Sequence, residues 1–566
     1  MSADRRLKVV LCWHMHQPCY FDPGQKRYQL PWTYLHAVKD YVDMAAHLEA
    51  VPAARAVVNF APILLEQIDD YTRQVRAFLA TNEPIGDMLL NALAQPELPQ
   101  RVDERVALMQ SCLRANEQRL IKRFPDYVRL VELMRAVQDD KEALGYLNDQ
   151  FLADLLVWYH LAWIAECVRR SDTRVQQLQS KGRGYTAEDR RLLVRLIGEL
   201  LNSVIPRYRR LAEQGQVELS VTPYAHPILP LLLDLRSARQ AIPDVHLPVL
   251  DHYPNGGERA QWHLRRGVEV FERYFGFRPH GCWPSEGSVS DAALGVLADG
   301  GFRWAASGEQ VLRNSLGAHH ATTSSGSPVH RPYRVATADI ACFFRDDGLS
   351  DLIGFSYSNW HADDAVANLV QHLETIGRDC AQDPSAVVSI IMDGENAWEY
   401  YPENAYYFLS ALYQRLSRHP GLELTTFSRC LDQAVAPRTL GSLVAGSWVY
   451  GTFSTWIGDR DKNHAWEMLG EAKLAVDEAL ESGAFSPERR AQIEQQLALC
   501  EGSDWFWWFG DYNPSDTVRD FDRLYRLHLT RLYELIGRAP PGYLSYAFSR
   551  GGGAQEAGGV MRRGSQ

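Results

Sequence analysis

Residues 386–393 read AVVSIIMD, a run of mostly β-branched and aliphatic residues that ends in an aspartate. Such a run is typical of a strand in a parallel sheet that is covered on both faces. Further strands are expected at 8–13, 54–60, 217–228, 302–307, 340–344 and 422–427, with helical patterns between them. About seven β/α units of this kind indicate an α/β protein with a parallel barrel or a doubly wound sheet.

Two segments break the alternation of strands and helices. Residues from about 100 to 214 show the helical spacing of apolar residues throughout, which predicts a helical insertion between the second and third strands. The chain is helical again from about 441. We therefore expect a catalytic barrel at 1–435 and a C-terminal helical domain at 436–545. The Gly-rich segment 546–566 has almost no aliphatic residues and is predicted to be disordered.

The composition excludes several classes of protein. The 566 residues carry 59 Lys and Arg against 70 Asp and Glu, a net charge of −11 without a basic run, so nucleic acid is not an expected partner. The longest apolar stretch, 155–165, is too short for a bilayer, which needs ~20 residues. The N-terminus does not resemble a signal peptide, and nine cysteines without a C-x-x-C pair indicate reduced thiols. We expect a soluble cytoplasmic protein.

Two carboxylates stand where α/β folds keep their active sites, at the carboxyl ends of strands. Glu286 follows Trp283 by three residues, and Asp393 ends the most apolar strand, with Trp398 nearby. Each carboxylate alone could be a helix cap or a solvated side chain. A pair of carboxylates beside aromatic rings suits the cleavage of a glycosidic bond, and 15 Trp, 26 Tyr and 20 Phe also suit the binding of sugar rings.

Five segments together resemble the motifs of glycoside hydrolase family 57, in the order in which that family has them. They are HMHQP at 14–18, GQVELSVTPYAHPILPLL at 215–232, GCWPSEGSVS at 281–290, IIMDGENAWEYY at 390–401 and GSWVYGTFSTWIGDRDKNHAW at 446–466.

The resemblance implies an incomplete (β/α)7 barrel, followed by a helical domain that completes the active-site cleft. It also implies a retaining mechanism on α-glucans, with Glu286 as the nucleophile and Asp393 as the general acid/base. An ionised Glu286 needs hydrogen-bond donors, which His14, His16 or Arg345 could supply. A protonated Asp393 needs a pKa raised by burial or by neighbouring carboxylates. This chemistry requires neither a metal ion nor a cofactor.

The remaining candidates for substrate binding lie in the motifs or at strand ends. Four tryptophans are candidates for stacking on glucose rings, although each could also pack in the core. His14 and His16 alternate on a strand and so share a face. Glu218 lies early in its strand and could be structural. The cluster DWFWWFGD at 504–511 either walls the cleft or seals the helical domain against the barrel. The full set is His14, His16, Glu218, His226, Trp283, Asp346, Glu395, Trp398, Trp448 and Trp456.

These observations predict a retaining hydrolase of α-glucans or maltooligosaccharides, of the α-amylase or amylopullulanase type. The HQP of the first motif favours this branch over the glycogen-branching one. A 4-α-glucanotransferase is an alternative, because transfer and hydrolysis share the covalent intermediate. A zinc-dependent enzyme similar to α-mannosidases or deacetylases is another, since His14, His16, His226 and Asp393 could bind a metal. A third is a glycan-binding protein without catalysis. Bond choice, chain-length preference and oligomeric state remain open at this point.

Overall fold

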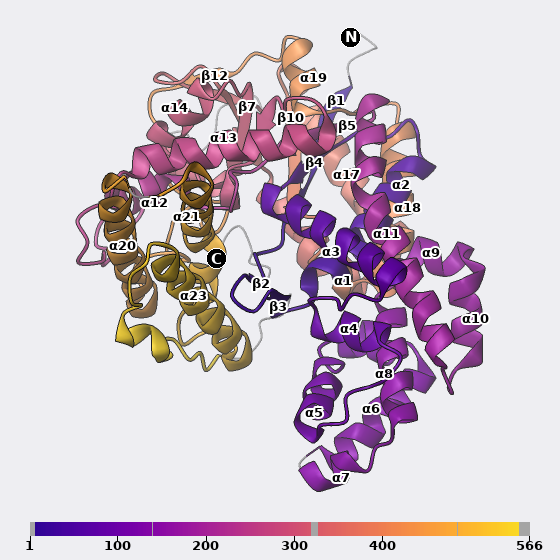
Figure 1. Ribbon diagram of the computed structural model, residues 1–566. Coiled ribbons are helices and arrows are strands. Elements are labelled where there is room, and N and C mark those ends of the chain that lie inside the picture. Colours follow the sequence, from indigo (N-terminus) through magenta and orange to yellow (C-terminus); the bar gives the residue numbers. More distant parts are fainter. Residues whose placement is uncertain (1–5, 139, 318–326, 484, 554–566) are drawn as a thin grey trace.

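The barrel consists of seven parallel strands (Figure 1). The computed structural model describes residues 6–553, except 139, 318–326 and 484. In pairing order the strands are β1 (Leu7–Met15), β4 (Ala56–Phe60), β5 (Val217–Val221), β6 (Gly281–Cys282), β7 (Trp304–Gly308), β9 (Ala341–Arg345) and β10 (Val387–Asp393), and β10 pairs again with β1. The predicted (β/α)7 barrel is thereby confirmed.

The ring of strands is closed unevenly. Strands β1 and β10 pair over seven residues, in a register that sets His14 beside Asp393. Strands β9 and β10 pair only at Arg345 and Ser389. The contact between β9 and β10 is therefore the short seam of an incomplete barrel.

The alternation of side chains along the strands explains why polar residues reach the interior. In β1, Val10 and Cys12 point into the barrel, whereas Val9, Leu11 and Trp13 pack in the outer core under the helices. In β10, Val387 and Ile391 point inward in the same way. Because the period of a strand is two residues, His14 and Asp393 continue the inward-facing series at the carboxyl ends of these strands.

Helices cover the outside of the barrel and alternate with its strands. They include α2 (Val42–Ala50), α3 (Pro62–Thr81), α13 (Gly256–Phe275), α14 (Asp291–Asp299), α15 (Glu309–Leu316), α17 (Ala362–Asp379), α18 (Tyr406–Arg418) and α19 (Phe427–Asp432). Three short strands lie at the periphery, β8 (Tyr333–Val335), β11 (Leu422–Leu424) and β12 (Arg438–Leu440). No helix in the described part of the chain is long and apolar enough to span a bilayer.

The predicted helical insertion lies between β4 and β5. Its helices are α5 (Val102–Ser111), α6 (Pro125–Val137), α7 (Lys141–Gly145), α8 (Asp149–Ala162), α9 (Glu166–Ser171), α10 (Thr173–Lys181) and α11 (Ala187–Glu213). The C-terminal helices are α20 (Arg460–Glu481), α21 (Pro487–Cys500), α22 (Ser503–Trp508) and α23 (Ser515–Leu535). Figure 1 shows the two helical parts on either side of the short hairpin of β2 (Phe21–Asp22) and β3 (Arg27–Tyr28).

A buried carboxylate joins the C-terminal helices to the barrel. Glu501, at the end of α21, accepts hydrogen bonds from Arg259 at 2.8 Å and from His263 at 2.7 Å, both on α13, and from Tyr253. Burial alone would raise the pKa of Glu501, but the charge of Arg259 and the bond from His263 lower it to about 2.

The end of the chain continues beside these helices. The backbone N–H groups of Gly552 and Gly553 donate to the carbonyl of Asn513. The rest of the segment that was predicted to be disordered, 554–566, lies outside the described residues.

Candidate active site

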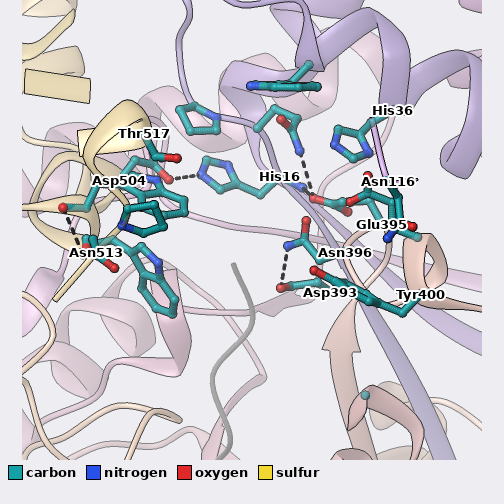
Figure 2. A pocket seen from close by; sticks show the side chains of 18 of the residues that line it. His16, His36, Asn116, Asp393, Glu395, Asn396, Tyr400, Asp504, Asn513 and Thr517 are labelled. Carbon is teal, nitrogen blue, oxygen red and sulfur yellow. Dashed lines mark hydrogen bonds and ion pairs between the residues drawn. The ribbon is translucent and has the colours of Figure 1, made fainter. Parts of the chain in front are cut away.

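A cavity of about 740 Å³ opens at the carboxyl ends of β1 and β10. Three parts of the chain line it (Figure 2). The barrel contributes His14, His16, Glu286, Asp393 and Glu395, the insertion contributes Asn116 and Trp163, and the C-terminal helices contribute Asp504, Trp507 and Trp508. Residues that are far apart in sequence therefore form one site.

Glu286 lies in the turn after β6 and has a left-handed backbone with φ of 58°. A non-glycine residue in this conformation costs of order 1–3 kcal/mol, so the surrounding structure must hold it in place. Trp448 holds Glu286 through two hydrogen bonds. Its indole Nε1 donates to Oε2 of Glu286 at 3.0 Å, and its backbone N–H donates to the carbonyl of Glu286 at 3.1 Å. Nδ1 of His226 lies 3.8 Å from Oε1.

Asp393 and Glu395 also line the cavity. Oδ2 of Asp393 accepts a hydrogen bond of 2.9 Å from Asn396 (Figure 2). Oε1 of Glu395 accepts from the backbone of His16 at 3.3 Å and from Gln17 at 3.4 Å. Oε2 of Glu395 is buried and has no hydrogen-bond partner among the described residues. A protonated Glu395 would therefore have a free donor.

The three carboxyl groups influence one another's protonation. Burial raises the pKa of Glu286 well above its ordinary value, and the charges of Asp393 and Asp504 raise it further. Burial also raises the pKa of Asp393 and, together with the charge of Asp393, that of Glu395. Because each added charge disfavours the next, the cluster retains protons at a pH at which free carboxyls have lost them.

Two histidines belong to a hydrogen-bonded chain beside these carboxyls. His14 Nδ1 bonds to Oδ1 of Asn59 at 2.7 Å, and its Nε2 lies 3.1 Å from Nε2 of His226. Nδ1 of His226 in turn bonds to the Ser503 hydroxyl at 2.8 Å. Burial lowers the pKa of His14 to about 3 and that of His226 well below its ordinary value. Both rings are therefore neutral at physiological pH.

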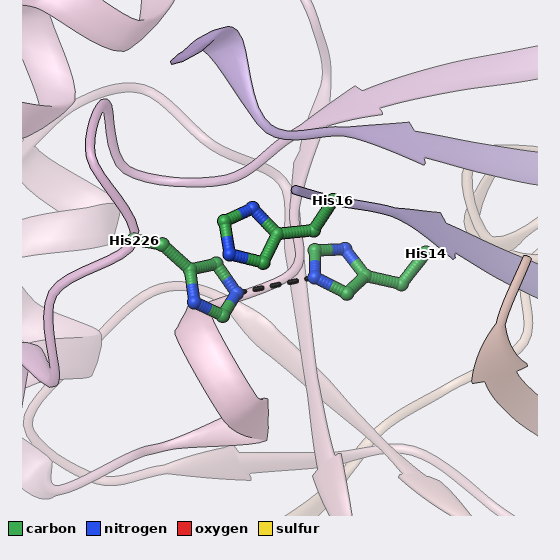
Figure 3. Close-up of side chains that lie close together, drawn as sticks. All are labelled: His14, His16 and His226. Carbon is green, nitrogen blue, oxygen red and sulfur yellow. Dashed lines mark hydrogen bonds between the residues drawn. The ribbon is translucent and has the colours of Figure 1, made fainter. Parts of the chain in front are cut away.

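The third histidine, His16, stacks on His226 with 3.9 Å between ring centroids and 16° between ring planes. Its Nε2 bonds to Asp504 at 2.8 Å. Figure 3 shows the three imidazoles together. One ring nitrogen from each lies within 4.8 Å of the others, a spacing at which three residues could hold one metal ion. A metal ion must lie in the plane of each imidazole that binds it. The ring planes of His16 and His226 are nearly parallel, so no point close to both rings lies in both planes. This arrangement favours hydrogen bonding over the binding of one metal ion by both rings.

The four predicted tryptophans have different surroundings. Trp448 lines the cavity. Trp283 is buried edge-on against Trp448, with ring centroids 5.3 Å apart. Trp398 is buried against Trp13, and Trp456 is buried against Trp507. Among these four, Trp448 is the one placed to touch a ligand, whereas the others support the wall behind it.

Glu218 and Asp346 lie outside the cavity lining, as do His226 and the buried Trp283, Trp398 and Trp456. Glu218, near the start of β5, accepts hydrogen bonds from Trp304 at 2.7 Å and from the backbone of Ser428 at 3.0 Å. Asp346 caps the N-terminus of α16 (Asp347–Asp351) and bonds to His330 at 2.8 Å.

The hydrogen-bond donor to Glu286 also differs from the expectation. Arg345 lines the cavity, but its guanidinium bonds to Asp347 and Asp351. His14 bonds to Asn59, and His16 bonds to Asp504. The side chain that donates to Glu286 is Trp448, which the sequence had indicated only as a stacking platform.

Of the two roles left open by the sequence, the aromatic cluster at 504–511 has that of lining the cavity, and its other rings pack within the C-terminal helices. Trp507 and Trp508 line the cavity together with Asp504. Trp505, Phe506 and Phe509 pack in the core of the C-terminal helices. The contribution of the insertion, through Asn116 and Trp163, had no motif that could reveal it.

Comparisons with known proteins concern the family and the fold of the chain. The family model described as Glycosyl hydrolase family 57 matches residues 10–443. A family 57 branching enzyme from Thermococcus kodakaraensis, solved with glucose, has a TM-score of 0.58 at 15% identity, with 94% of this chain and 90% of that chain covered.

Two other solved structures have a TM-score of 0.51. The α-amylase AmyC from Thermotoga maritima is 13% identical over 96% of both chains. A 4-α-glucanotransferase from Thermococcus litoralis is 14% identical, with 94% of this chain and 60% of that chain covered. At such identities the likeness concerns the fold. No curated protein matches this chain.

Proposed function

The chain belongs to glycosyl hydrolase family 57, and from this premise we propose that it is a retaining α-glucan hydrolase that forms a covalent glycosyl-enzyme. In this proposal Glu286 is the nucleophile and Asp393 the general acid/base. The supporting observation is that both carboxyl groups line one cavity, where the Trp448 indole donates a hydrogen bond to Glu286 and burial raises the pKa of Asp393. The proposed enzyme is of the α-amylase or amylopullulanase type and cuts α-1,4 bonds of α-glucans, with α-1,6 bonds as a second candidate.

The proposed reaction has two steps. Protonated Asp393 gives its proton to the glycosidic oxygen while the carboxylate of Glu286 attacks the anomeric carbon. Trp448 stabilises the carboxylate of Glu286 through the indole N–H. Once the glycosyl ester has formed, the negative charge of Glu286 is gone, so the pKa of Asp393 falls. Asp393 then accepts a proton from water, and water releases the sugar.

The rest of the cavity suits a neutral polysaccharide. His14 and His226 are uncharged, and the buried Oε2 of Glu395 is free to bond to a sugar hydroxyl. The aromatic side chains that line the cavity include Trp163, Trp448 and Trp508. Flat apolar ring faces with polar edges match the two kinds of surface on a glucose ring.

A 4-α-glucanotransferase is the second candidate. The cavity has walls from both the insertion and the C-terminal helices, and these walls offer surfaces on which an acceptor sugar chain would bind. A sugar hydroxyl would then take the place of water in the second step.

Product analysis on maltoheptaose and pullulan tests the proposal. Products shorter than the substrate indicate hydrolysis, a ladder of longer linear chains indicates transfer, and new branch points indicate branching. Release of maltotriose from pullulan indicates cleavage of α-1,6 bonds. Glu286→Gln is the matched inactive control. Binding of maltoheptaose without any turnover by the unmodified protein would favour a glycan-binding protein. Loss of turnover in chelator, restored by zinc, would favour a metal-dependent hydrolase.

We also propose that the protein works in the cytoplasm. All nine cysteines are free thiols, and none forms a disulfide. A reducing compartment keeps cysteines in this state. Fractionation of the source cells with an antibody against the chain would test the location.

A further inference from the structure

The residues that line the cavity form two groups, one on each side (Figure 2). Asp504 and Thr517, from the C-terminal helices, lie on one side, which we call the C-terminal end. Asn116, from the insertion, and Tyr400, which follows β10, lie on the other side, which we call the insertion end. A glucan chain that fills the cavity therefore has one part at each end.

The contacts of the proposed nucleophile extend toward the C-terminal end. Nδ1 of His226 lies 3.8 Å from Oε1 of Glu286. The ring of His226 stacks on that of His16, and Nε2 of His16 bonds to Asp504 at 2.8 Å. Trp448, which donates to Glu286, lies in the segment that leads to the C-terminal helices. Glu286 is thus joined to that end of the cavity.

The proposed general acid begins a segment that borders the insertion end. Oδ2 of Asp393 accepts a hydrogen bond of 2.9 Å from Asn396, and Asn396, Glu399 and Tyr400 all line the cavity. The carbonyl of Tyr400 accepts a hydrogen bond of 2.8 Å from Nε of Arg119, which belongs to the insertion. The segment that carries Asp393 is therefore joined to the insertion.

This division gives the substrate a direction. In a retaining reaction the nucleophile bonds to the anomeric carbon of the sugar that stays, whereas the acid protonates the oxygen of the chain that leaves. The leaving chain therefore lies on the side of Asp393, which is the insertion end. The sugars that stay on Glu286 lie toward the C-terminal end.

The insertion end has side chains suited to a sugar. Trp32, the first residue of α1 (Trp32–His36), lines the cavity with a ring that is only partly buried. Trp163 of the insertion supports it, with ring centroids 6.0 Å apart. Trp163 itself is 1% exposed, and its buried Nε1 has no hydrogen-bond partner among the described residues. Because buried N–H groups are normally bonded, this unpartnered donor indicates a ligand that supplies an acceptor.

We propose that the insertion end binds the leaving part of the glucan, with Trp32 as the ring on which a glucose unit stacks and Trp163 as the donor to a sugar hydroxyl. The inference rests on the proposed function and makes these two residues determinants of specificity. An acceptor sugar would occupy the same place in a transfer reaction, since the second step retraces the geometry of the first. Trp508, on the opposite side, would contact the sugars that stay.

A substrate without a leaving sugar separates the two ends. In α-maltotriosyl fluoride, Glu286 attacks the anomeric carbon, the C–F bond breaks and fluoride departs without a sugar at the leaving position. Water then cleaves the ester, so that the products are maltotriose, fluoride and a proton. The kcat/KM for fluoride release includes only the steps up to formation of the ester, and it is therefore independent of the acceptor. Maltoheptaose, by contrast, needs both ends of the cavity.

The experiment compares Trp32→Ala and Trp508→Ala on these two substrates. Loss of an aromatic binding surface should lower kcat/KM for maltoheptaose by about tenfold or more in Trp32→Ala. The same variant should keep fluoride release within about twofold of the unmodified protein, which also shows that it is folded. Trp508→Ala should lower both values. Trp360→Ala, at a partly exposed ring outside the cavity lining, should change neither.

Trp163→Phe provides a second variant in case Trp32→Ala does not fold. It removes the N–H, keeps a ring behind Trp32, and should also lower kcat/KM for maltoheptaose while sparing the fluoride. Equal losses on both substrates in Trp32→Ala, or no loss on either, would overturn the inference. If Trp508→Ala spared the fluoride and Trp32→Ala did not, the leaving chain would lie at the C-terminal end.

Glu286→Gln distinguishes a failure of this inference from a failure of the proposed function. Fluoride release by the unmodified protein that Glu286→Gln abolishes would support the proposed nucleophile, whatever the result at Trp32. No fluoride release by the unmodified protein, or equal release by Glu286→Gln, would overturn the proposed function and this inference with it.

Discussion

The indole Nε1 of Trp448 donates a hydrogen bond to the Glu286 carboxylate at 3.0 Å, across 162 residues of sequence. Next to this bond, the backbone N–H groups of Val289 and Gly446 donate to each other's carbonyls. These hydrogen bonds therefore join the turn that carries Glu286 to the segment that leads to the C-terminal helices. The orientation of the proposed nucleophile depends on a part of the chain that lies outside the seven barrel strands.

Trp448→Phe should weaken catalysis by removing the indole N–H while keeping an aromatic ring. A hydrogen bond to a charged group contributes about 1.5–3 kcal/mol, so kcat/KM should fall roughly 10- to 150-fold. The lost bond had stabilised the ionised form, so the pKa of Glu286 should rise and the acidic limb of the pH–rate profile should move to higher pH. Initial rates on soluble starch across pH would measure both effects. Trp360→Phe, at a partly exposed ring, is the control, and an unchanged profile in Trp448→Phe would contradict the role given to the indole.

Glu286→Ala and Asp393→Asn should separate the two proposed catalytic roles. Each should lower turnover of maltoheptaose by several orders of magnitude, because one removes the nucleophile and the other the proton donor. Azide fits the space left by Glu286→Ala and should restore part of the activity, giving a glycosyl azide of inverted anomeric configuration. Nuclear magnetic resonance of the product identifies the anomer. A retained anomer, or Glu286→Ala with near-normal activity, would remove Glu286 from the nucleophile position.

Glu395→Gln should stabilise the protein at neutral pH. Burial raises the pKa of Glu395 well above the ordinary 4.5, so the unfolded chain ionises this group first as the pH rises. The carboxyl therefore costs stability above about pH 4.5, and this cost is absent at lower pH. We expect the Tm of the variant to exceed that of the unmodified protein by about 1–2 °C at pH 8 and to equal it near pH 4. Glu132→Gln, at an exposed position on α6, should have no such effect.

Much of the architecture could be predicted because strand periodicity is a local signal. The apolar run 386–393 placed Asp393 at a strand end, and β10 spans Val387–Asp393. The helical segment predicted after about residue 441 includes α20 and α21, whose apolar spacing repeats over several turns. Asp459 is the residue that caps α20, accepting from the backbone of Asp461.

The contacts between distant segments could not be predicted in this way. A single sequence does not show the hydrogen bonds between distant residues. Examples are those of Trp448 with Glu286, of His226 with Ser503 and of Trp304 with Glu218. Residue type alone leaves the role of a tryptophan open, because its side chain is both a flat ring and an N–H donor. Which of these properties is used depends on what the fold places beside the indole.

Glu501→Gln should loosen the attachment of the C-terminal helices and, through them, the wall of the cavity. The buried carboxylate neutralises the charge of Arg259 and accepts the N–H of His263. Removal of one partner from a buried ion pair lowers the stability of a protein by about 3–5 kcal/mol. Because the pKa of Glu501 is lowered to about 2, its stabilising effect is present above the ordinary 4.5 and disappears as the pH falls from about 4.5 to about 2.

The Tm of Glu501→Gln should therefore lie several degrees below that of the unmodified protein at pH 7, and the difference should shrink across this acidic range. Hydrogen exchange should show lost protection in α21 to α23 before the barrel strands open. Glu488→Gln, an exposed position in the first turn of the same helix α21, is the matched control. Activity on maltoheptaose should fall together with the protection from hydrogen exchange, because Asp504 and Trp508, which line the cavity, come shortly after Glu501 in the sequence. A variant with unchanged protection but lost activity would instead mean that Glu501 acts on the site by another route.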